Sequence, residues 1–271
     1  MRKITDIKVL RKIMLSLACE VKKICEENNL RYYLAGGTLL GAVRHKGFIP
    51  WDDDIDLYMP RPDYDRFIEI YYKAGGQNIL HAQEINPKYL YSYIKISAKD
   101  TVLHEKEAQC GVELGVNIDI FPLDGLGDSI EDAHKIFRKI DLPIKLLMSY
   151  RVDKIRKHVS FVKNCMVVGA SIVAHLFGSK KLSIKINKIA QTYDFDKSKY
   201  VGTFVDEVGD NRIYEKELFD GFCELEFEGC VFVVPSGYEK VLTKLYGDYM
   251  KLPPIEKQVF THGYEAYIKE E

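Results

Sequence analysis

The sequence has no excess of positive charge, because its 39 lysines and arginines are balanced by 40 aspartates and glutamates. Proteins that bind a nucleic-acid duplex usually carry a basic excess that neutralises phosphates. The composition therefore gives no support for nucleic acid as a partner. A small nucleotide held by a local site remains compatible with this charge balance.

Zinc-binding and disulfide patterns are also absent. The six cysteines form no CxxC pair and no cluster with histidine at zinc-ligand spacing. We therefore expect reduced thiols that are mostly packed inside the protein. The first residues carry charges where a secretory signal peptide needs an apolar stretch, so we expect a cytoplasmic enzyme.

Repeats and low-complexity tracts are missing, and the 46% hydrophobic content is enough for a large core. One apolar run extends from Cys165 to Phe177, between basic stretches. As a helix, this run would span about 20 Å, short of the roughly 30 Å hydrocarbon core of a bilayer. It is compatible with a buried helix of a second lobe, or with peripheral contact to a membrane or a membrane-linked partner.

A glycine-rich turn and an aspartate cluster lie close together between residues 36 and 57. Gly36 and Gly37 follow a short predicted strand, so their backbone can approach a phosphate while the next helix offers free N–H groups. Asp54 and Asp56 alternate with apolar residues, which places both carboxylates on one face of a predicted strand. Because such a pair repels itself unless a cation lies between, the motif predicts a phosphate and metal site.

The hydrophobic pattern predicts the other elements. The clearest is a helix over residues 7–27 with one apolar stripe and Thr5 or Asp6 as its cap. Further helices are predicted at 60–73, 130–150, 160–177, 182–193 and 237–246, with a brief helical turn from Thr38. Strands are predicted at 31–35, 54–59, 79–82, 89–97, 102–104, 116–121 and 200–206, with a hairpin over 222–234.

The strand predicted at 89–97 places Tyr89, Tyr91, Tyr93 and Lys95 on one face. That face is either a half-exposed aromatic surface or part of the active site, where Lys95 would meet a phosphate and Tyr93 would line a pocket. Asp119 lies between two isoleucines in another predicted strand, where an unpaired carboxylate is costly unless something binds it. It is the natural third acid, whereas Asp124, beside Gly125, is predicted to be a turn residue.

These motifs together resemble the LicD family. They are Leu34 to Leu57, Asp119 to Asp124, and Tyr246-Gly247-Asp248-Tyr249-Met250 followed by Pro253 and Pro254. Fukutin-related protein, a distant relative, shares the glycine turn and the aspartates. The resemblance implies an α+β fold with a polymerase-β-type nucleotidyltransferase core, a mixed sheet flanked by helices. We place this core at residues 1–125, and a mainly helical lobe with a C-terminal hairpin, on the acceptor side, at 126–271.

The resemblance also implies an activity, the Mg²⁺-dependent transfer of phosphocholine or a similar phospho-alcohol from CDP-choline or a related donor, releasing CMP. The acceptor would be a sugar hydroxyl of a cell-surface glycopolymer such as teichoic acid or lipopolysaccharide, or its lipid-linked precursor. Two alternatives stay open. One is transfer of a nucleoside monophosphate from an NTP to a small molecule, and the other is an inactive binding or scaffold subunit.

Carried onto this chain, the resemblance assigns Asp54 and Asp56 as catalytic metal ligands and Asp119 as the third acid, for one or two Mg²⁺ ions or Mn²⁺. Gly36, Gly37 and Thr38 would hold the phosphates. Three further motif residues could either contact the substrate or have a structural role. They are Arg44, His45 and Lys46. Asp52 and Asp53 would join the metal shell or the substrate site, or shape their loop, and His262 is a further active-site candidate.

Overall fold

The computed structural model describes residues 1–105, 110–151, 161–204, 209–260 and 263–270. At its centre lies a mixed sheet with the strand order β2 (Tyr33–Leu34), β3 (Asp56–Pro60), β7 (Asn117–Gly127), β5 (Ile94–Ser97) and β4 (Ile79–His81). β3 and β7 run parallel, and the other neighbours in this order are antiparallel. An α+β fold with a mixed sheet is thereby confirmed, whereas the polymerase-β type of the core stays a prediction.

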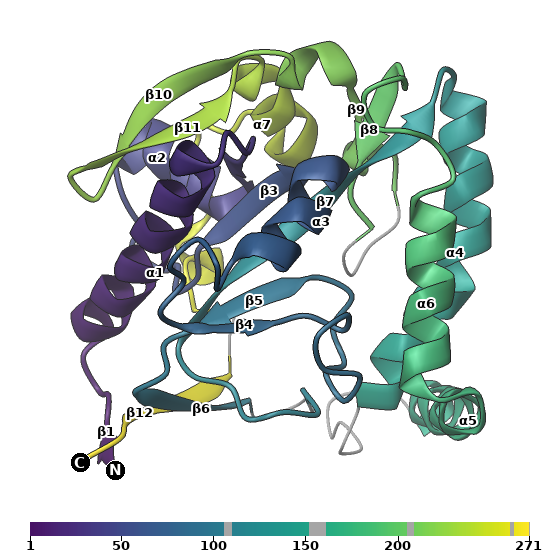
Figure 1. Ribbon diagram of the computed structural model, residues 1–271, viewed down its shortest axis with the longest axis horizontal. Coiled ribbons are helices and arrows are strands. Elements are labelled where there is room, and N and C mark those ends of the chain that lie inside the picture. Colours follow the sequence, from purple (N-terminus) through teal and green to yellow (C-terminus); the bar gives the residue numbers. More distant parts are fainter. Residues whose placement is uncertain (106–109, 152–160, 205–208, 261–262, 271) are drawn as a thin grey trace.

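Other strands extend this framework. β7 pairs beyond the central sheet with β8 (Tyr200–Gly202), which pairs with β9 (Ile213–Glu215). β10 (Phe222–Phe227) and β11 (Cys230–Pro235) form the hairpin that the sequence predicted. β1 (Arg2–Lys3), β12 (Tyr264–Ile268) and β6 (Thr101–Glu105) form a third sheet, which brings the two ends of the chain side by side (Figure 1).

The described residues contain seven α-helices. These are α1 (Ile7–Glu27), α2 (Gly36–His45), α3 (Arg61–Ile70), α4 (Ile130–Arg151), α5 (Phe161–Phe177), α6 (Ser179–Ala190) and α7 (Tyr238–Tyr246), with short 3₁₀ turns at Asp210–Arg212, Lys216–Phe219 and Ile255–Lys257. Asp6 caps α1 by accepting from the N–H of Lys8. Figure 1 shows α4, α5 and α6 gathered beside the end of β7, on the side away from the hairpin.

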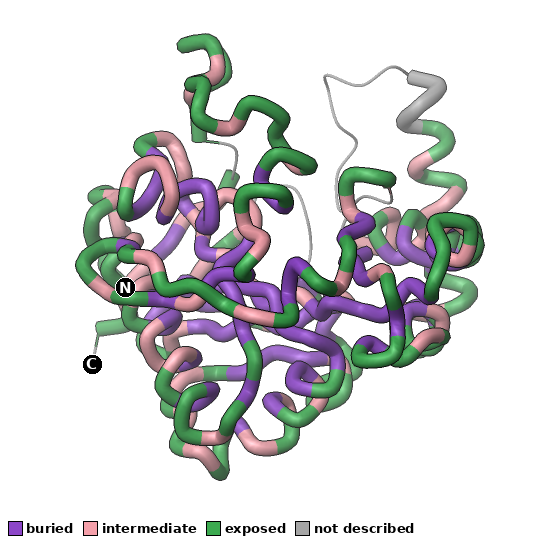
Figure 2. Tube along the Cα trace, turned by 90° about the horizontal axis from the view of Figure 1, so that it is seen from above, coloured by how far each residue is buried: buried purple, intermediate pink, exposed green. Residues whose placement is uncertain are grey.

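The described residues form three buried hydrophobic clusters, and the two larger ones hold these parts together. The larger one joins α1, α2, α3 and the central strands to β8, β11 and α7, so it draws on residues from both halves of the chain. The smaller one fills the space between α4, α6 and the end of β7. Figure 2 shows the buried segments crossing the middle of the molecule and the exposed ones around them. The division into two domains at residue 125 stays a prediction.

Three local predictions were wrong in detail. The strand expected at 89–97 is confined to Ile94–Ser97, and Tyr89 is fully buried, so this face is not a half-exposed surface. The helical turn expected from Thr38 is a ten-residue helix that begins at Gly36. The strand expected to end at residue 121 continues to Gly127, because its second half pairs with β8, a contact distant in sequence.

Asp124 is a buried strand residue, so its prediction as a turn residue was wrong. Its two carboxylate oxygens accept from Nε and Nη2 of Arg61, at 2.7 and 2.9 Å. Both side chains are at least nine-tenths buried. The pair therefore fastens the start of α3 to the middle of β7, and its geometry is the bidentate one that favours arginine.

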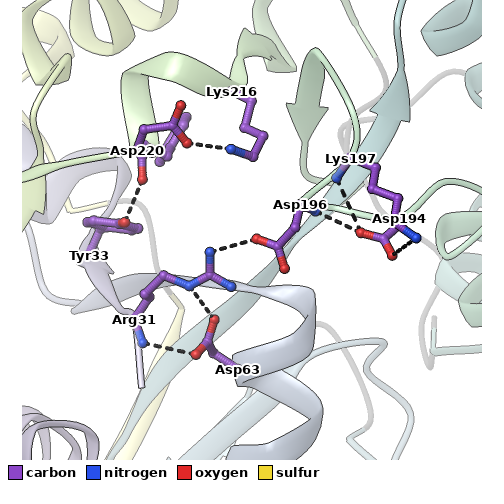
Figure 3. Close-up of polar contacts among 9 residues, drawn as sticks. Arg31, Tyr33, Asp63, Asp194, Asp196, Lys197, Lys216 and Asp220 are labelled. Carbon is purple, nitrogen blue, oxygen red and sulfur yellow. Dashed lines mark hydrogen bonds and ion pairs between the residues drawn. The ribbon is translucent and has the colours of Figure 1, made fainter. Parts of the chain in front are cut away.

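A second ionic group ties the N-terminal and C-terminal segments together on the outside of the sheet. Figure 3 shows Arg31, which follows α1, between Asp63 of α3 and Asp196. Its Nε lies 2.7 Å from Asp63 and its Nη1 lies 2.8 Å from Asp196. In the same view, the hydroxyl of Tyr33 donates to the carbonyl of Phe219.

Removing the charge of Asp124 is expected to destabilise the protein strongly. Asp124→Asn leaves the buried guanidinium of Arg61 uncompensated, which should lower the free energy of unfolding by about 3–5 kcal/mol in urea denaturation. Asp65→Asn is the matched control, because Asp65 is half-exposed and lies 3.5 Å from the same guanidinium. Asp65→Asn should lower the free energy of unfolding by about 1 kcal/mol or less. Equal losses in the two variants would contradict a special role for the buried pair.

Candidate active site

A pocket of about 610 Å³ opens beside the central sheet. Many of the residues singled out from the sequence line it, among them Gly36, Gly37, Asp53, Asp54, Asp56, Tyr91, Tyr93, Lys95 and Asp119. It is the size of a ligand site for a small molecule. The glycine turn and all three predicted acids therefore meet in one cavity.

The strand register places three charged residues in one row at the floor of this pocket. Asp56 of β3 lies opposite Asp119 of β7, which in turn lies opposite Lys95 of β5. Residues that pair across neighbouring strands point to the same face of a sheet. The row continues to His81 of β4, whose pKa is lowered to about 4 by burial and by the charge of Lys95.

Lys95 makes the closest contact to the third acid. Its Nζ donates to both carboxylate oxygens of Asp119, at 2.6 and 2.8 Å, and to the side-chain oxygen of Asn117 at 3.1 Å. Lys95 is buried, so this ion pair is shielded from solvent. Lys95 therefore lies in the pocket as predicted and neutralises Asp119 there, while its contact to a phosphate stays a prediction.

The remaining acids repel one another. The pKa of Asp56 is raised well above its ordinary value, mainly by burial and then by the charges of Asp54 and Asp119. Asp52 adds to this rise and Lys95 opposes it. Within the described parts of the chain, no three acidic, histidine or cysteine side chains are already gathered as a metal-binding group.

The donor chemistry nevertheless fits a magnesium ion. Carboxylate oxygens are the ligands that this cation prefers, and a positive charge beside Asp54 and Asp56 would relieve the repulsion that raises the pKa of Asp56. Asp119 differs from these two because its oxygens already accept from Lys95. The residues therefore fit a cation best on the side of Asp54 and Asp56.

The two glycines begin α2 directly above these acids. Gly36 has a φ of +49°, which favours glycine, and a Cβ there would lie 3.2 Å from Oδ2 of Asp56. A Cβ on Gly37 would lie 2.7 Å from Oδ2 of Asp52. No side chain caps this helix, whose first N–H groups have no partner within the helix. The helix start is therefore a place where an anion is stabilised.

Thr38 supports the backbone of the segment that carries the aspartates. It is buried and outside the pocket lining, and its Oγ1 accepts from the N–H of Asp56 at 2.9 Å. The N–H of Ala35 donates to the carbonyl of Asp56 from the other side. These bonds hold the helix start against the first residue of β3, whereas a phosphate contact of Thr38 stays a prediction.

Arg11 of α1 holds the loop that carries the aspartates, a role that sequence reasoning missed. Its guanidinium donates to the carbonyls of Ile49, Pro50 and Asp52, with the shortest distance, 2.6 Å, to Asp52. The hydroxyl of Tyr264 donates to the carbonyl of Asp53 at 3.2 Å. The loop is thus shaped by contacts from both ends of the chain.

Arg44, His45 and Lys46 lie away from the pocket, at the C-terminal end of α2. Nε of Arg44 lies 3.0 Å from Nε2 of His45, and Nη1 of Arg44 donates to the carbonyl of Tyr249. The pKa of His45 is lowered by burial and by Arg44. Lys46 adopts a left-handed conformation that ends the helix, and its carbonyl accepts from Glu228. These contacts join α2 to the hairpin and to the segment after α7.

Aromatic residues and further cations complete the wall of the pocket. Tyr91 and Tyr93 line it, whereas Tyr89 and Trp51 do not. The guanidinium of Arg151, at the end of α4, lies 3.5 Å from the ring centre of Tyr91, and the hydroxyl of Tyr91 donates to Glu105.

Sequence reasoning missed several lining residues because they come from distant segments with no motif around them. Arg151 and Arg212 are two such cations, and Glu105 and Tyr246 also contribute. The Nε atom of Arg212 is buried and has no hydrogen-bond partner in the described structure. Tyr246 is the exception, since it belongs to the late motif, which was the one available signal. His262 lies outside the described residues.

Comparison with known proteins gives a match to the family model described as LicD/FKTN/FKRP, nucleotidyltransferase domain, over residues 29–128. Lipopolysaccharide cholinephosphotransferase LicD of Haemophilus influenzae is 35% identical over 251 residues, which cover 90% of this chain and 91% of that protein. Ribitol 5-phosphate transferase FKRP of Homo sapiens is 56% identical over 34 residues, 12% of this chain and 7% of that protein. The first similarity extends over nearly the whole chain, and the second is local.

Thr38 offers a test of how the helix start is attached to the acids. Thr38→Val removes the acceptor for the N–H of Asp56 while keeping the shape of the side chain. Leaving that group unsatisfied should lower the free energy of unfolding by about 1–3 kcal/mol and speed exchange of the Asp56 amide hydrogen. Thr38→Ser keeps the hydroxyl and should protect this amide as the wild type does. Unchanged exchange in Thr38→Val would contradict the bond.

Proposed function

The chain belongs to the LicD family of phosphotransferases, and we propose that it transfers phosphocholine or a similar phosphorylated alcohol from a CDP-linked donor to a sugar hydroxyl. The observation that carries this proposal is the meeting of a glycine-started helix with Asp54, Asp56 and Asp119 in one pocket. Phosphoryl transfer requires little covalent chemistry from a protein and depends on positioning and on charge stabilisation.

The donor diphosphate is placed at the start of α2. The first N–H groups of α2 have no side-chain cap, and the helix dipole favours an anion there. Arg212, which lines the same pocket, is a cation suited to the diphosphate, because an arginine side chain can donate two hydrogen bonds to a phosphate group at once. Asp54 and Asp56, with Asp119 as the third acid, would hold Mg²⁺. When bound, the ion neutralises the charge that develops on the phosphates.

In the transfer step, the acceptor hydroxyl oxygen forms a bond to the phosphorus that bears the alcohol. The bond from this phosphorus to the oxygen that bridges to CMP breaks, and CMP leaves with that oxygen. The hydroxyl proton passes to Asp54 or Asp56, since both oxygens of Asp119 accept from Lys95. Lys95 holds the carboxylate of Asp119 in place through these two bonds, which fixes the floor of the pocket.

Choline as the transferred alcohol is supported by the name of the Haemophilus influenzae relative and by the aromatic wall. A quaternary ammonium group donates no hydrogen bond and is recognised by aromatic faces and negative charge. Tyr93 packs against Phe121, with ring centres 4.6 Å apart, and Glu105 lies beside Tyr91. These groups are where we place the choline, whereas ribitol or glycerol would call for hydroxyl partners.

The acceptor is proposed to be a sugar of a cell-surface glycopolymer, lipopolysaccharide or teichoic acid, or of its lipid-linked precursor, modified on the cytoplasmic side of the membrane. The name of the relative that covers nearly the whole chain supports lipopolysaccharide. The second candidate activity, nucleotidyl transfer from an NTP, would use the same acids and release pyrophosphate. A binding subunit without turnover is the third, and it would bind nucleotide with little dependence on Mg²⁺.

A donor screen separates these possibilities. CDP-choline, CDP-ribitol, CDP-glycerol and the four NTPs are incubated with the protein and a glycan acceptor, and CMP and pyrophosphate are measured. We expect CMP from CDP-choline, loss of turnover on chelation with EDTA, and recovery with Mg²⁺ or Mn²⁺. Pyrophosphate from an NTP would establish the second activity, and EDTA-insensitive binding without either product would establish the third.

The acids are tested by removing one charge at a time. Asp54→Asn or Asp119→Asn should lower kcat at least about 100-fold while the circular dichroism spectrum stays that of the folded wild type. Asp128→Asn is the control, since Asp128 carries the same change outside the pocket and should keep near-normal activity. Near-normal activity of either pocket variant would refute its role.

A further inference from the structure

Helix α5 presents an apolar surface to solvent. Of its side chains from Cys165 to Phe177, Ala174 alone is buried, so the interpretation as a buried helix was wrong. The large apolar side chains that are exposed are Met166 (61%), Val168 (43%), Ile172 (60%), Val173 (42%), Leu176 (82%) and Phe177 (56%). Helices on the surface of a globular protein normally carry polar residues on this side.

Polar and apolar side chains near the end of α5 lie on neighbouring faces of the helix. Ser171 and His175 are spaced by four residues and share a face, and the ring of His175 stacks on Tyr150 of α4 with centres 4.0 Å apart. Ile172 and Leu176 have the same spacing on the next face, and both are exposed to solvent. The ring of His175 thus contacts α4, while Ile172 and Leu176 are left exposed to solvent.

The surrounding sequence is strongly basic. Residues 154–193 contain no aspartate or glutamate, whereas eight of them are lysine or arginine, in a chain whose net charge is −1. At the end of α5, Lys180, Lys181 and Lys185 of α6 are exposed beside Leu176 and Phe177. An apolar helical face with a basic border is complementary to an interface of acyl chains and anionic headgroups.

From this combination, we propose that the outward face of α5, with the lysines at the start of α6, binds the surface of a membrane that contains anionic lipids. A second copy of the chain is a poorer occupant, because basic residues flank the apolar run on both sides and a two-fold contact would bring like charges together. In the part of the chain that the structure describes, no single helix is long and apolar enough to cross a bilayer, although α5 and α6 pass that test jointly as a pair bent by 90°. Binding is therefore assigned to the interface.

This surface is connected to the active pocket. α5 packs on α4, and the last residue of α4, Arg151, lines the pocket. Figure 1 shows α5 end-on at the outer corner of this helical group, with the central sheet on one side of it. Docking through α5 would hold the pocket near lipid-linked molecules, but membrane binding itself requires neither donor nor acceptor.

The test is sedimentation of the full chain with vesicles, in the absence of any nucleotide or glycan. Vesicles of phosphatidylcholine alone are compared with vesicles that also contain phosphatidylglycerol. We expect binding to the anionic vesicles that weakens with added salt, and much less binding to the neutral ones. Equal binding to both, or binding to neither, would overturn the proposal.

Two sets of variants locate the surface. Ile172→Ser combined with Leu176→Ser should lower partitioning at least roughly tenfold, and Lys180→Glu with Lys181→Glu should lower it on the order of tenfold. Phe222→Ser with Val231→Ser is the matched control, because these apolar side chains are 65% and 45% exposed on the hairpin and should leave partitioning unchanged. Circular dichroism and light scattering accompany each variant. Unchanged partitioning of the α5 variant, or a dimer that this variant abolishes, would overturn the assignment to lipid.

Discussion

The parallel alignment of β3 with β7 is the constraint on which the site depends. It sets Asp56 opposite Asp119, and the antiparallel alignment of β5 then sets Lys95 opposite Asp119. A shift of one residue in either strand would turn these side chains to the other face of the sheet. The buried residues that alternate with them, such as Ile120 and Leu57, fix the register because they belong in the core.

The chemistry of the pocket follows from a balance between this row of charges and its surroundings. Lys95 neutralises one acid, whereas Asp54 and Asp56 remain beside the uncapped start of α2, where the helix dipole also favours negative charge. The same arrangement that tolerates these carboxylates suits a cation and a diphosphate. Arg11 and Tyr264 hold the loop in this position from opposite ends of the chain.

Much of the fold could be predicted from local patterns. The stripe of α1 and the hairpin after residue 222 are set by neighbouring residues, and both lie where the sequence placed them. The strand predicted at 54–59 begins only at Asp56, so Asp54 lies in the loop before it. The length of β7 and the burial of Asp124 could not be predicted, because they depend on pairing with β8 and on Arg61, both far away in the sequence. The exposure of α5 could not be predicted either, because an apolar run has the same sequence pattern whether the helix is buried or exposed.

The sequence by itself determined which chemistry the protein carries, since a glycine turn followed by alternating aspartates and a third acid identifies the family from local spacing. Only the tertiary structure decided how those groups are paired. In the folded protein, Lys95 is paired with Asp119, and Arg44 and Lys46 lie outside the pocket. Arg151 and Arg212, which come from distant segments, line it. The physical reason is that the period of a strand or helix is fixed by covalent geometry, whereas register, burial and long-range contacts follow from packing of the whole chain.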